Sequence, residues 1–160
     1  MDTSKKVKAS KVINAPAEDI FALLADPNRH TEFDGADMLR GPEGDAAPIG
    51  GIGQTFTMNM YAPDLGEYRM INTVVAFLPG ARIGWGPRVD PTCSLAEQLG
   101  DMDAGGHTYT YDLKPVDGGT EVTQTYEWMS VKDPNFEAFF PRVSQEQLAA
   151  TLDNLEAAVS

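Results

Sequence analysis

The sequence predicts an α+β domain in which an antiparallel β-sheet packs against a long C-terminal α-helix. Three observations lead to this fold class: an alternating apolar and polar segment near the N-terminus, five later strand-like segments with turn signals between them, and an amphipathic helical segment at the end. The chain has 160 residues, of which 42% are hydrophobic. A chain of this length buries about 70% of its unfolded surface, so a single domain over residues 1–160 needs neither a disulfide nor a metal to fold.

The N-terminal part of the chain predicts one strand followed by two short helices. Residues 7–13 alternate between apolar and polar side chains, and the lysines in and beside this segment are typical of a guarded edge strand. A helix begins near Pro16, which suits a first turn because it lacks an N–H group, and ends at Asp26-Pro27. A short helical turn follows over residues 28–33, and we expect His30 to lie at the surface or to cap that turn.

The middle of the chain reads as strands interrupted by two long loops. Residues 34–53 and 89–106 are rich in glycine and proline, and loops of this length in a compact domain are usually functional or mobile. Pro63-Asp64-Leu65-Gly66 and Val116-Asp117-Gly118-Gly119 are hairpin signals. The predicted strands cover residues 54–61, 67–77, 81–88, 107–113 and 120–129.

The C-terminal segment predicts the long helix. Ser144-Gln145-Glu146-Gln147 forms a capping box, the sequence signature of a helix start. Beyond it, apolar residues recur at spacings of four, three and four, which places them on one helical face: Leu148, Leu152, Leu155 and Val159.

Several of these segments resemble the polyketide cyclase/dehydrase and lipid-transport family of the START-like, Bet v 1-like (SRPBCC) superfamily. The resemblance rests on Ile13-Asn14-Ala15-Pro16-Ala17-Glu18-Asp19-Ile20-Phe21, on Leu24-Ala25-Asp26-Pro27, on Gly118-Gly119-Thr120-Glu121-Val122-Thr123 and on the terminal helix. It implies the helix-grip fold, a curved antiparallel sheet of seven strands wrapped around the final helix, with a cavity for an apolar ligand between them. Six strands are clear in this sequence, and the seventh lies in residues 35–41 or 89–99 or is missing.

The last hairpin presents a face of large, mostly amphipathic side chains. A turn centred on Asp117-Gly118 pairs Leu113 with Val122, and period two then assigns one set of residues to the interior. The opposite set consists of short polar and acidic side chains, which suit a solvent-facing side. The predicted interior set is His107, Tyr109, Tyr111, Gln124, Tyr126 and Trp128, and aromatic walls with a few polar groups are typical of a small-molecule pocket.

The same parity argument extends the predicted ligand-binding set to other elements. It places Phe56, Met58 and Met60 on the inner face, with Arg69, Ile71, Thr73, Val75 and Phe77 on the partner strand. Arg69 either meets an anionic group of a ligand or lies at the strand end beside water or an acidic residue. Trp85 shares a face with Ile83, and Leu148 and Leu152 complete the set from the helix.

The overall charge and the single cysteine restrict the partners and the location. A net charge of −12 argues against nucleic acid or an anionic membrane surface as a partner. Met1–Lys6 precede no apolar segment, and no long apolar run occurs, so we expect neither a secretory signal nor membrane insertion. Cys93 alone forms no intramolecular disulfide, which fits a cytoplasmic protein and an inert thiol. The sequence is compatible with a homodimer.

The functional prediction is the binding of a lipid, polyketide or phenolic molecule in an internal cavity. The alternative is a polyketide cyclase or dehydratase with His107 as acid/base and Tyr109 and Tyr111 as hydroxyl donors. A third reading is a partner-binding module resembling the chaperone-ATPase activators of this fold. The chain has no nucleophile-elbow or phosphate-loop motif, and two histidines with one cysteine build no usual zinc site, so neither a metal nor a cofactor is expected.

Overall fold

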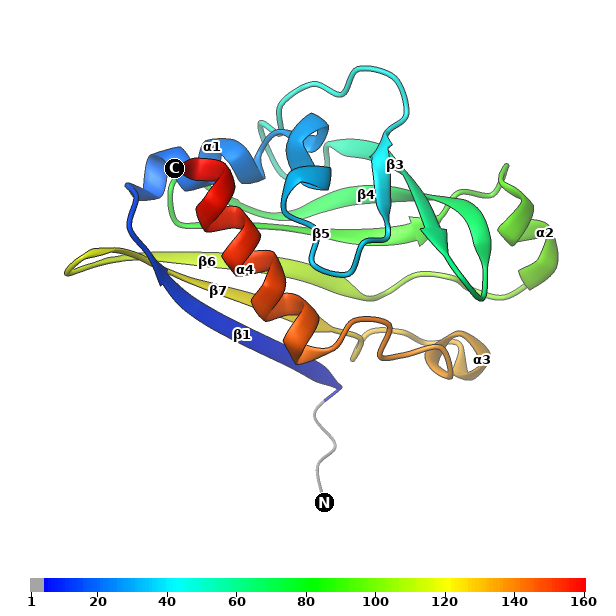
Figure 1. The fold of residues 1–160 in the computed structure, drawn as a ribbon. Helices are drawn as coiled ribbons and strands as arrows, with labels where there is room; N and C mark the ends of the chain where they lie inside the picture. The colour runs from blue at the N-terminus through cyan, green and yellow to red at the C-terminus, as the bar shows by residue number, and fades with distance from the viewer. Residues whose placement is uncertain (1–4) are drawn as a thin grey trace.

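A computed structural model describes residues 5–160, and Figure 1 shows a curved antiparallel sheet crossed on one face by the C-terminal helix. The sheet has seven strands in the order β1-β7-β6-β5-β4-β3-β2. The α+β class and the helix-grip arrangement are therefore confirmed. Part of Met1–Lys6, which entered the expectation of no secretory signal, lies outside the described residues. The strands are β1 (Lys6–Ile13), β2 (Leu39–Pro42), β3 (Thr55–Ala62), β4 (Gly66–Leu78), β5 (Arg82–Val89), β6 (Thr108–Val116) and β7 (Gly119–Glu127).

Several helices begin at the capping residues that the sequence predicts. Pro16 is the N-cap of the first helix, and Asp26 caps the following 3-10 turn by accepting a hydrogen bond from the backbone N–H of Asn28. The capping box of the last helix is complete. None of the helices in the described part of the chain has the length and hydropathy needed to cross a membrane. The helices are α1 (Ala17–Leu24), η1 (Pro27–Glu32), α2 (Ser94–Leu99), α3 (Pro134–Glu137) and α4 (Gln145–Val159).

The seventh strand is β2, which lies inside the segment predicted as the first long loop. It has four residues and an irregular register against β3 between Leu39 and Gly41, so it shows no alternating pattern that the sequence could reveal. The second predicted loop contains the six residues of α2. Such short elements are stabilised by their neighbours rather than by their own periodicity.

The predicted register of the last hairpin is confirmed. Leu113 pairs with Val122, Tyr111 with Gln124 and Tyr109 with Tyr126. The local turn sets this register, because Val116 and Gly119 close a two-residue loop. His107 and Trp128 lie one residue beyond the ends of the two strands.

The predicted facing of β4 is wrong by one residue. Phe56 pairs with Asn72 and Met58 with Met70, so the even-numbered residues of β4 share the inner face with β3. Three residues, 63–65, separate the first paired positions Ala62 and Gly66, and this loop length determines the parity. The residues that face inward are therefore Tyr68, Met70, Asn72 and Val74, and those on the other face are Arg69, Ile71, Thr73 and Val75.

A β-bulge later in β4 changes the facing again. The pairing with β5 shifts between Val74 and Ala76, which leaves Val75 without a counterpart and half exposed. Phe77 then returns to the inner face, where its ring lies 5.5 Å from that of Phe21. Phe77 therefore faces inward as predicted, but the reason is the bulge, which strict alternation of side chains along a strand does not include.

The main core lies between the sheet, α1 and the C-terminal half of α4. Its fully buried members include Ile13 of β1, Ile20 and Leu24 of α1, and Leu155 of α4. β1 is an edge strand with lysines, as predicted. The Nζ of Lys11 forms ion pairs with carboxylate oxygens of Asp153 and Glu156 on α4, at 2.6 and 3.2 Å. These contacts hold the helix across the sheet. Towards α2 and α3, a second cluster of buried residues, among them Leu95 and Phe136, lies beside a cavity.

Candidate ligand cavity

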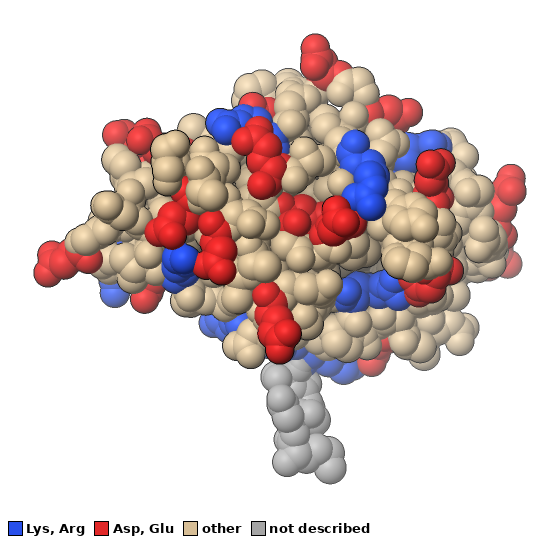
Figure 2. All heavy atoms as spheres, viewed as in Figure 1, with Lys and Arg blue, Asp and Glu red and all other residues tan. Residues whose placement is uncertain are grey.

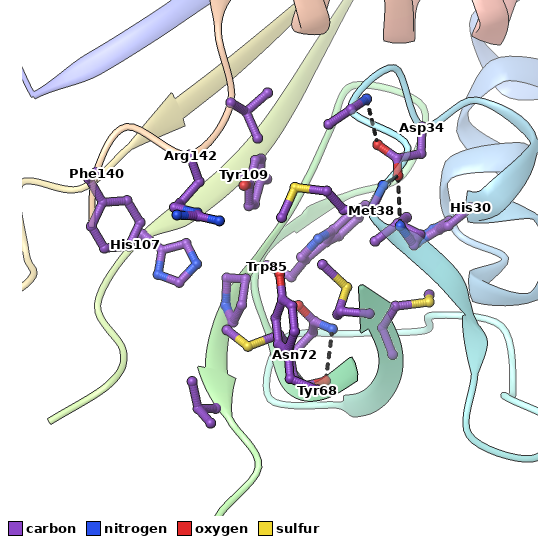
Figure 3. Close-up of a pocket in the computed structure, with 18 of the residues that line it drawn as sticks. His30, Asp34, Met38, Tyr68, Asn72, Trp85, His107, Tyr109, Phe140 and Arg142 are labelled. Carbon is purple, nitrogen blue, oxygen red and sulfur yellow. Dashed lines mark hydrogen bonds between the residues drawn. The ribbon is translucent and has the colours of Figure 1, made fainter. Parts of the chain in front are cut away.

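A cavity of about 150 Å³ opens between the inner face of the sheet, the 30–39 segment and the chain leading into α4. Most of its wall is apolar, contributed by methionine, leucine and aromatic side chains. Figure 3 shows the labelled residues converging on it from η1 and the following loop, from the sheet, and from the segment after α3.

Nine of the thirteen residues predicted to bind a ligand line this cavity. They come from five elements and the residue before β6, and are Phe56, Met58, Met60, Trp85, His107, Tyr109, Tyr111, Gln124 and Leu148. Three others of the set are buried or half-buried elsewhere: Tyr126 behind Tyr109, Trp128 against Phe140, and Leu152 in the main core.

Arg69 does not line the cavity, which corrects its inclusion in the ligand-binding set. It lies on the opposite face of β4, because the β3–β4 register differs from the predicted one by a residue. Its Nε donates to Oδ2 of Asp90 at 3.0 Å, and its Nη2 donates to the hydroxyl of Thr92 at 3.1 Å. The acidic neighbour, considered above as the alternative, therefore accounts for this arginine.

His107 is buried among aromatic side chains. Its exposed fraction is 6%, and its ring centroid lies 4.8 Å from that of Phe140 and 5.9 Å from that of Phe136. Nδ1 has no hydrogen-bond partner among the described residues. Burial lowers the pKa of His107 to about 4, so the imidazole is neutral at pH 7 and offers one donor and one acceptor nitrogen.

Gln124 is the second polar group left without a full set of partners. Its Nε2 donates to the phenol oxygen of Tyr111 at 2.9 Å, but its buried Oε1 has no partner among the described residues. Burial raises the pKa of Tyr111 far above its ordinary value, so that the phenol stays protonated. Two residues that line the cavity, His107 and Gln124, therefore each hold one buried polar atom without a partner among the described residues, Nδ1 and Oε1.

The stacking of Tyr109 on Tyr126 explains why only the first reaches the cavity. The two rings are parallel within 4° with centroids 4.6 Å apart, as expected for a cross-strand aromatic pair. Tyr126 is fully buried, and its hydroxyl oxygen accepts a hydrogen bond from the backbone N–H of Arg142 at 3.0 Å. Tyr109 is partly buried and lines the cavity, and burial raises its pKa.

His30 is part of the cavity wall and not a surface residue, contrary to the sequence-based expectation. Only 2% of it is exposed, its Nε2 donates to the carbonyl oxygen of Leu24 at 2.8 Å, and its ring stacks on Trp85 at 4.8 Å. Burial lowers its pKa to about 4. No periodic pattern marked it, because its neighbours in the 3-10 turn, Arg29 and Glu32, pair with each other at the surface.

The charged residues of the wall are compensated within the protein. Asp34 accepts hydrogen bonds from the backbone N–H groups of Ala36, Met38 and Leu39 at 2.7–3.0 Å. Arg142 donates from both terminal nitrogens to the carboxylate of Asp64, at 2.9 and 2.8 Å. This pairing holds the pKa of Asp64 below its ordinary value. Neither residue was predicted, since nothing local to 34 or 142 indicates a position beside a cavity.

The outer surface is unlike the cavity wall. Figure 2 shows acidic side chains spread over the visible face with basic ones interspersed, as the net charge of −12 implies. Among residues 5–160, no three His, Cys, Asp or Glu side chains are grouped so that they could hold a metal ion.

The sequence matches the family described as polyketide cyclase/dehydrase and lipid transport over residues 4–160. The chain belongs to this family. Among curated proteins, it is 27% identical over 124 residues to the uncharacterized protein Rv0088 of Mycobacterium tuberculosis, a match that covers 77% of this chain and 47% of that protein. The chain thus spans about half the length of the curated relatives it matches.

Solved structures share the fold of this family member at low identity. Protein Ms6760 from Mycobacterium smegmatis superposes with a TM-score of 0.68 at 15% identity, over 98% of this chain and 91% of that one. Protein CV1439 from Chromobacterium violaceum gives 0.65 at 17% identity, over 97% and 96% of the two chains. These likenesses establish the architecture around the cavity.

Proposed function

We propose that the protein binds a compact hydrophobic small molecule, of lipid, polyketide or phenolic character, in the cavity between the sheet and the chain leading into α4. The observation that carries the proposal is an apolar wall interrupted by two buried polar atoms without partners, His107 Nδ1 and Gln124 Oε1. Membership of the polyketide cyclase/dehydrase and lipid transport family supports it.

The energetics favour an occupant that supplies the missing partners. A buried polar atom without a hydrogen bond costs about 1–3 kcal/mol, which a ligand atom in reach would return. Covering the apolar wall adds about 25 cal/mol per Å² removed from water. The volume of about 150 Å³ is below the roughly 300–1,000 Å³ of typical ligand pockets, so the ligand is expected to have one or two rings.

Equilibrium dialysis against 2-methylnaphthalene tests the proposal with a neutral two-ring probe. Met60→Trp places a larger ring on the cavity wall and should weaken binding at least tenfold, whereas Tyr61→Trp on the exposed face of the same strand should leave it unchanged. Unfolding midpoints of both variants verify that they are folded. Absence of binding to the wild type, or equal binding by the Met60 variant, would contradict the proposal. Native mass spectrometry of the freshly purified protein gives an independent measurement through any co-purified ligand.

The second candidate is a cyclase or dehydratase that uses the same cavity. The unpartnered Nδ1 of a neutral His107 favours it, because such a nitrogen can accept a proton from a bound polyketone. The ring centroids of His107 and Tyr109 lie 6.1 Å apart. His107→Phe would then abolish conversion of a poly-β-ketone substrate while 2-methylnaphthalene still binds. Retained turnover in that variant rejects the catalytic role of His107.

A further inference from the structure

We infer that the cavity selects neutral, hydroxyl-bearing ligands over carboxylates, with His107 and Gln124 as the groups that receive the hydroxyl. This inference rests on the proposed binding function and names the chemistry that the ligand must carry. It follows from the hydrogen bonds that the cavity-lining residues can still form with a ligand, and from the lack of a free positive charge that could pair with an anionic ligand.

The first step is the identity of the free atoms. The amide nitrogen of Gln124 is committed to Tyr111, so the remaining Oε1 can only accept a hydrogen bond. A ligand that satisfies it must therefore present a donor. Both residues are more than nine-tenths buried and line the cavity, so water outside the protein is not their partner.

The second step concerns His107, which is held among hydrophobic rings. A neutral imidazole has one N–H donor and one acceptor nitrogen, and a hydroxyl group matches either because it both donates and accepts. Burial keeps this ring neutral at pH 7, so it offers no positive charge to an anion. A hydroxyl is thus the simplest group that serves His107 and Gln124 alike.

The third step is the absence of a spare positive charge. Among the described residues that line the cavity, Arg142 is the one permanent cation, and Figure 3 shows it on the same side as His107. Both of its terminal nitrogens are held by Asp64, and Asp34 adds a carboxylate to the wall. An ionised carboxylate entering this cavity would lose its hydration without gaining a free counter-charge, which is strongly unfavourable.

Three probes of one ring system separate these effects in equilibrium dialysis at pH 7. They are 2-naphthol, which is neutral, 2-naphthoate, which is ionised, and 2-methylnaphthalene, which has no polar group. We expect 2-naphthol to bind about tenfold more tightly than 2-methylnaphthalene, because it forms one additional hydrogen bond with the protein. We expect 2-naphthoate to bind at least tenfold more weakly than 2-methylnaphthalene. The double variant His107→Phe, Gln124→Met should bind 2-naphthol and 2-methylnaphthalene about equally. Thr125→Val is the matched control, since Thr125 lies beside Gln124 on the other face of β7, outside the cavity lining, and the change leaves both free atoms in place.

The outcomes distinguish this inference from the function on which it rests. Binding of 2-methylnaphthalene with no preference for 2-naphthol, or with tighter binding of 2-naphthoate, overturns the selectivity and leaves the hydrophobic cavity standing. A preference for 2-naphthol that persists in the double variant also overturns the assignment to His107 and Gln124. If none of the three probes binds, the proposed function itself fails. The ranking on the wild type decides the selectivity even where the double variant does not fold.

Discussion

The two buried histidines predict that the protein loses stability between pH 7.5 and pH 5.5. Burial lowers the pKa of His30 and of His107 to about 4, whereas both titrate near 6.5 in the unfolded chain. The folded state thus prefers the neutral imidazoles. Their contribution to the free energy of unfolding is fully present above pH 6.5 and is lost as the pH falls towards 4.

The expected magnitude follows from these two pKa values. Each histidine binds protons more tightly in the unfolded state, and the resulting loss between pH 7.5 and 5.5 is about 1.3 kcal/mol per residue. The two together remove about 2.7 kcal/mol, a substantial share of the 5–15 kcal/mol typical of a folded domain. Unperturbed carboxyl groups titrate near pH 4, below this interval, so the interval reports mainly on the histidines.

Urea unfolding followed by tryptophan fluorescence at the two pH values measures this loss. His30→Gln keeps a side-chain N–H donor for the carbonyl of Leu24, and His107→Phe keeps an aromatic ring among Phe136 and Phe140. Each variant should show about 1.3 kcal/mol less pH dependence than the wild type, whatever its absolute stability. The reasoning is refuted if the variants keep the full wild-type dependence, because another group would then carry it.

Two further predictions concern the elements that frame the cavity, each with a matched variant. Gly119→Ala should destabilise the fold by about 3 kcal/mol in urea unfolding, because the φ angle of Gly119 is +141° and a Cβ there would collide with the carbonyl oxygen of Ile13. Gly118→Ala has open space around the new Cβ and should cost only about 1 kcal/mol, so equal losses in the two variants would contradict this reasoning. Ser144→Ala should cost about 1 kcal/mol by removing the hydroxyl that accepts from the N–H of Gln147 at 3.1 Å, and Ser144→Asp should restore most of that loss; an unaffected alanine variant would show that the capping box does not stabilise α4.

The candidate site could be predicted in part because some of it depends on local rules. His107, Tyr109, Tyr111 and Gln124 share a face through a two-residue turn only a few residues away, and that turn alone determines their alternation. The β3–β4 hairpin has a three-residue loop, for which the same reasoning selected the wrong parity. The predicted inward position of Arg69 is therefore wrong, and Tyr68 and Asn72 face inward instead.

The remaining wall residues depend on contacts between distant parts of the chain. His30 is buried because Trp85, 55 positions later, stacks on it, and Arg142 is balanced by Asp64, 78 positions earlier. The spacing of residues around His30 or around Arg142 does not predict these long-range contacts. The same is true of the missing partners of His107 and Gln124, since an unsatisfied atom is defined by everything that packs around it.

The family, the α+β architecture, the last hairpin and the terminal helix could be predicted from the amino-acid sequence, because turn chemistry, capping and hydrophobic periodicity act over a few residues. The side chains that enclose the cavity, and the polar atoms among them that lack a partner, depend instead on how distant segments pack together. Strand order, the β4 bulge and the paths of residues 30–39 and 136–143 bring those groups together over long separations, where local propensity has no influence.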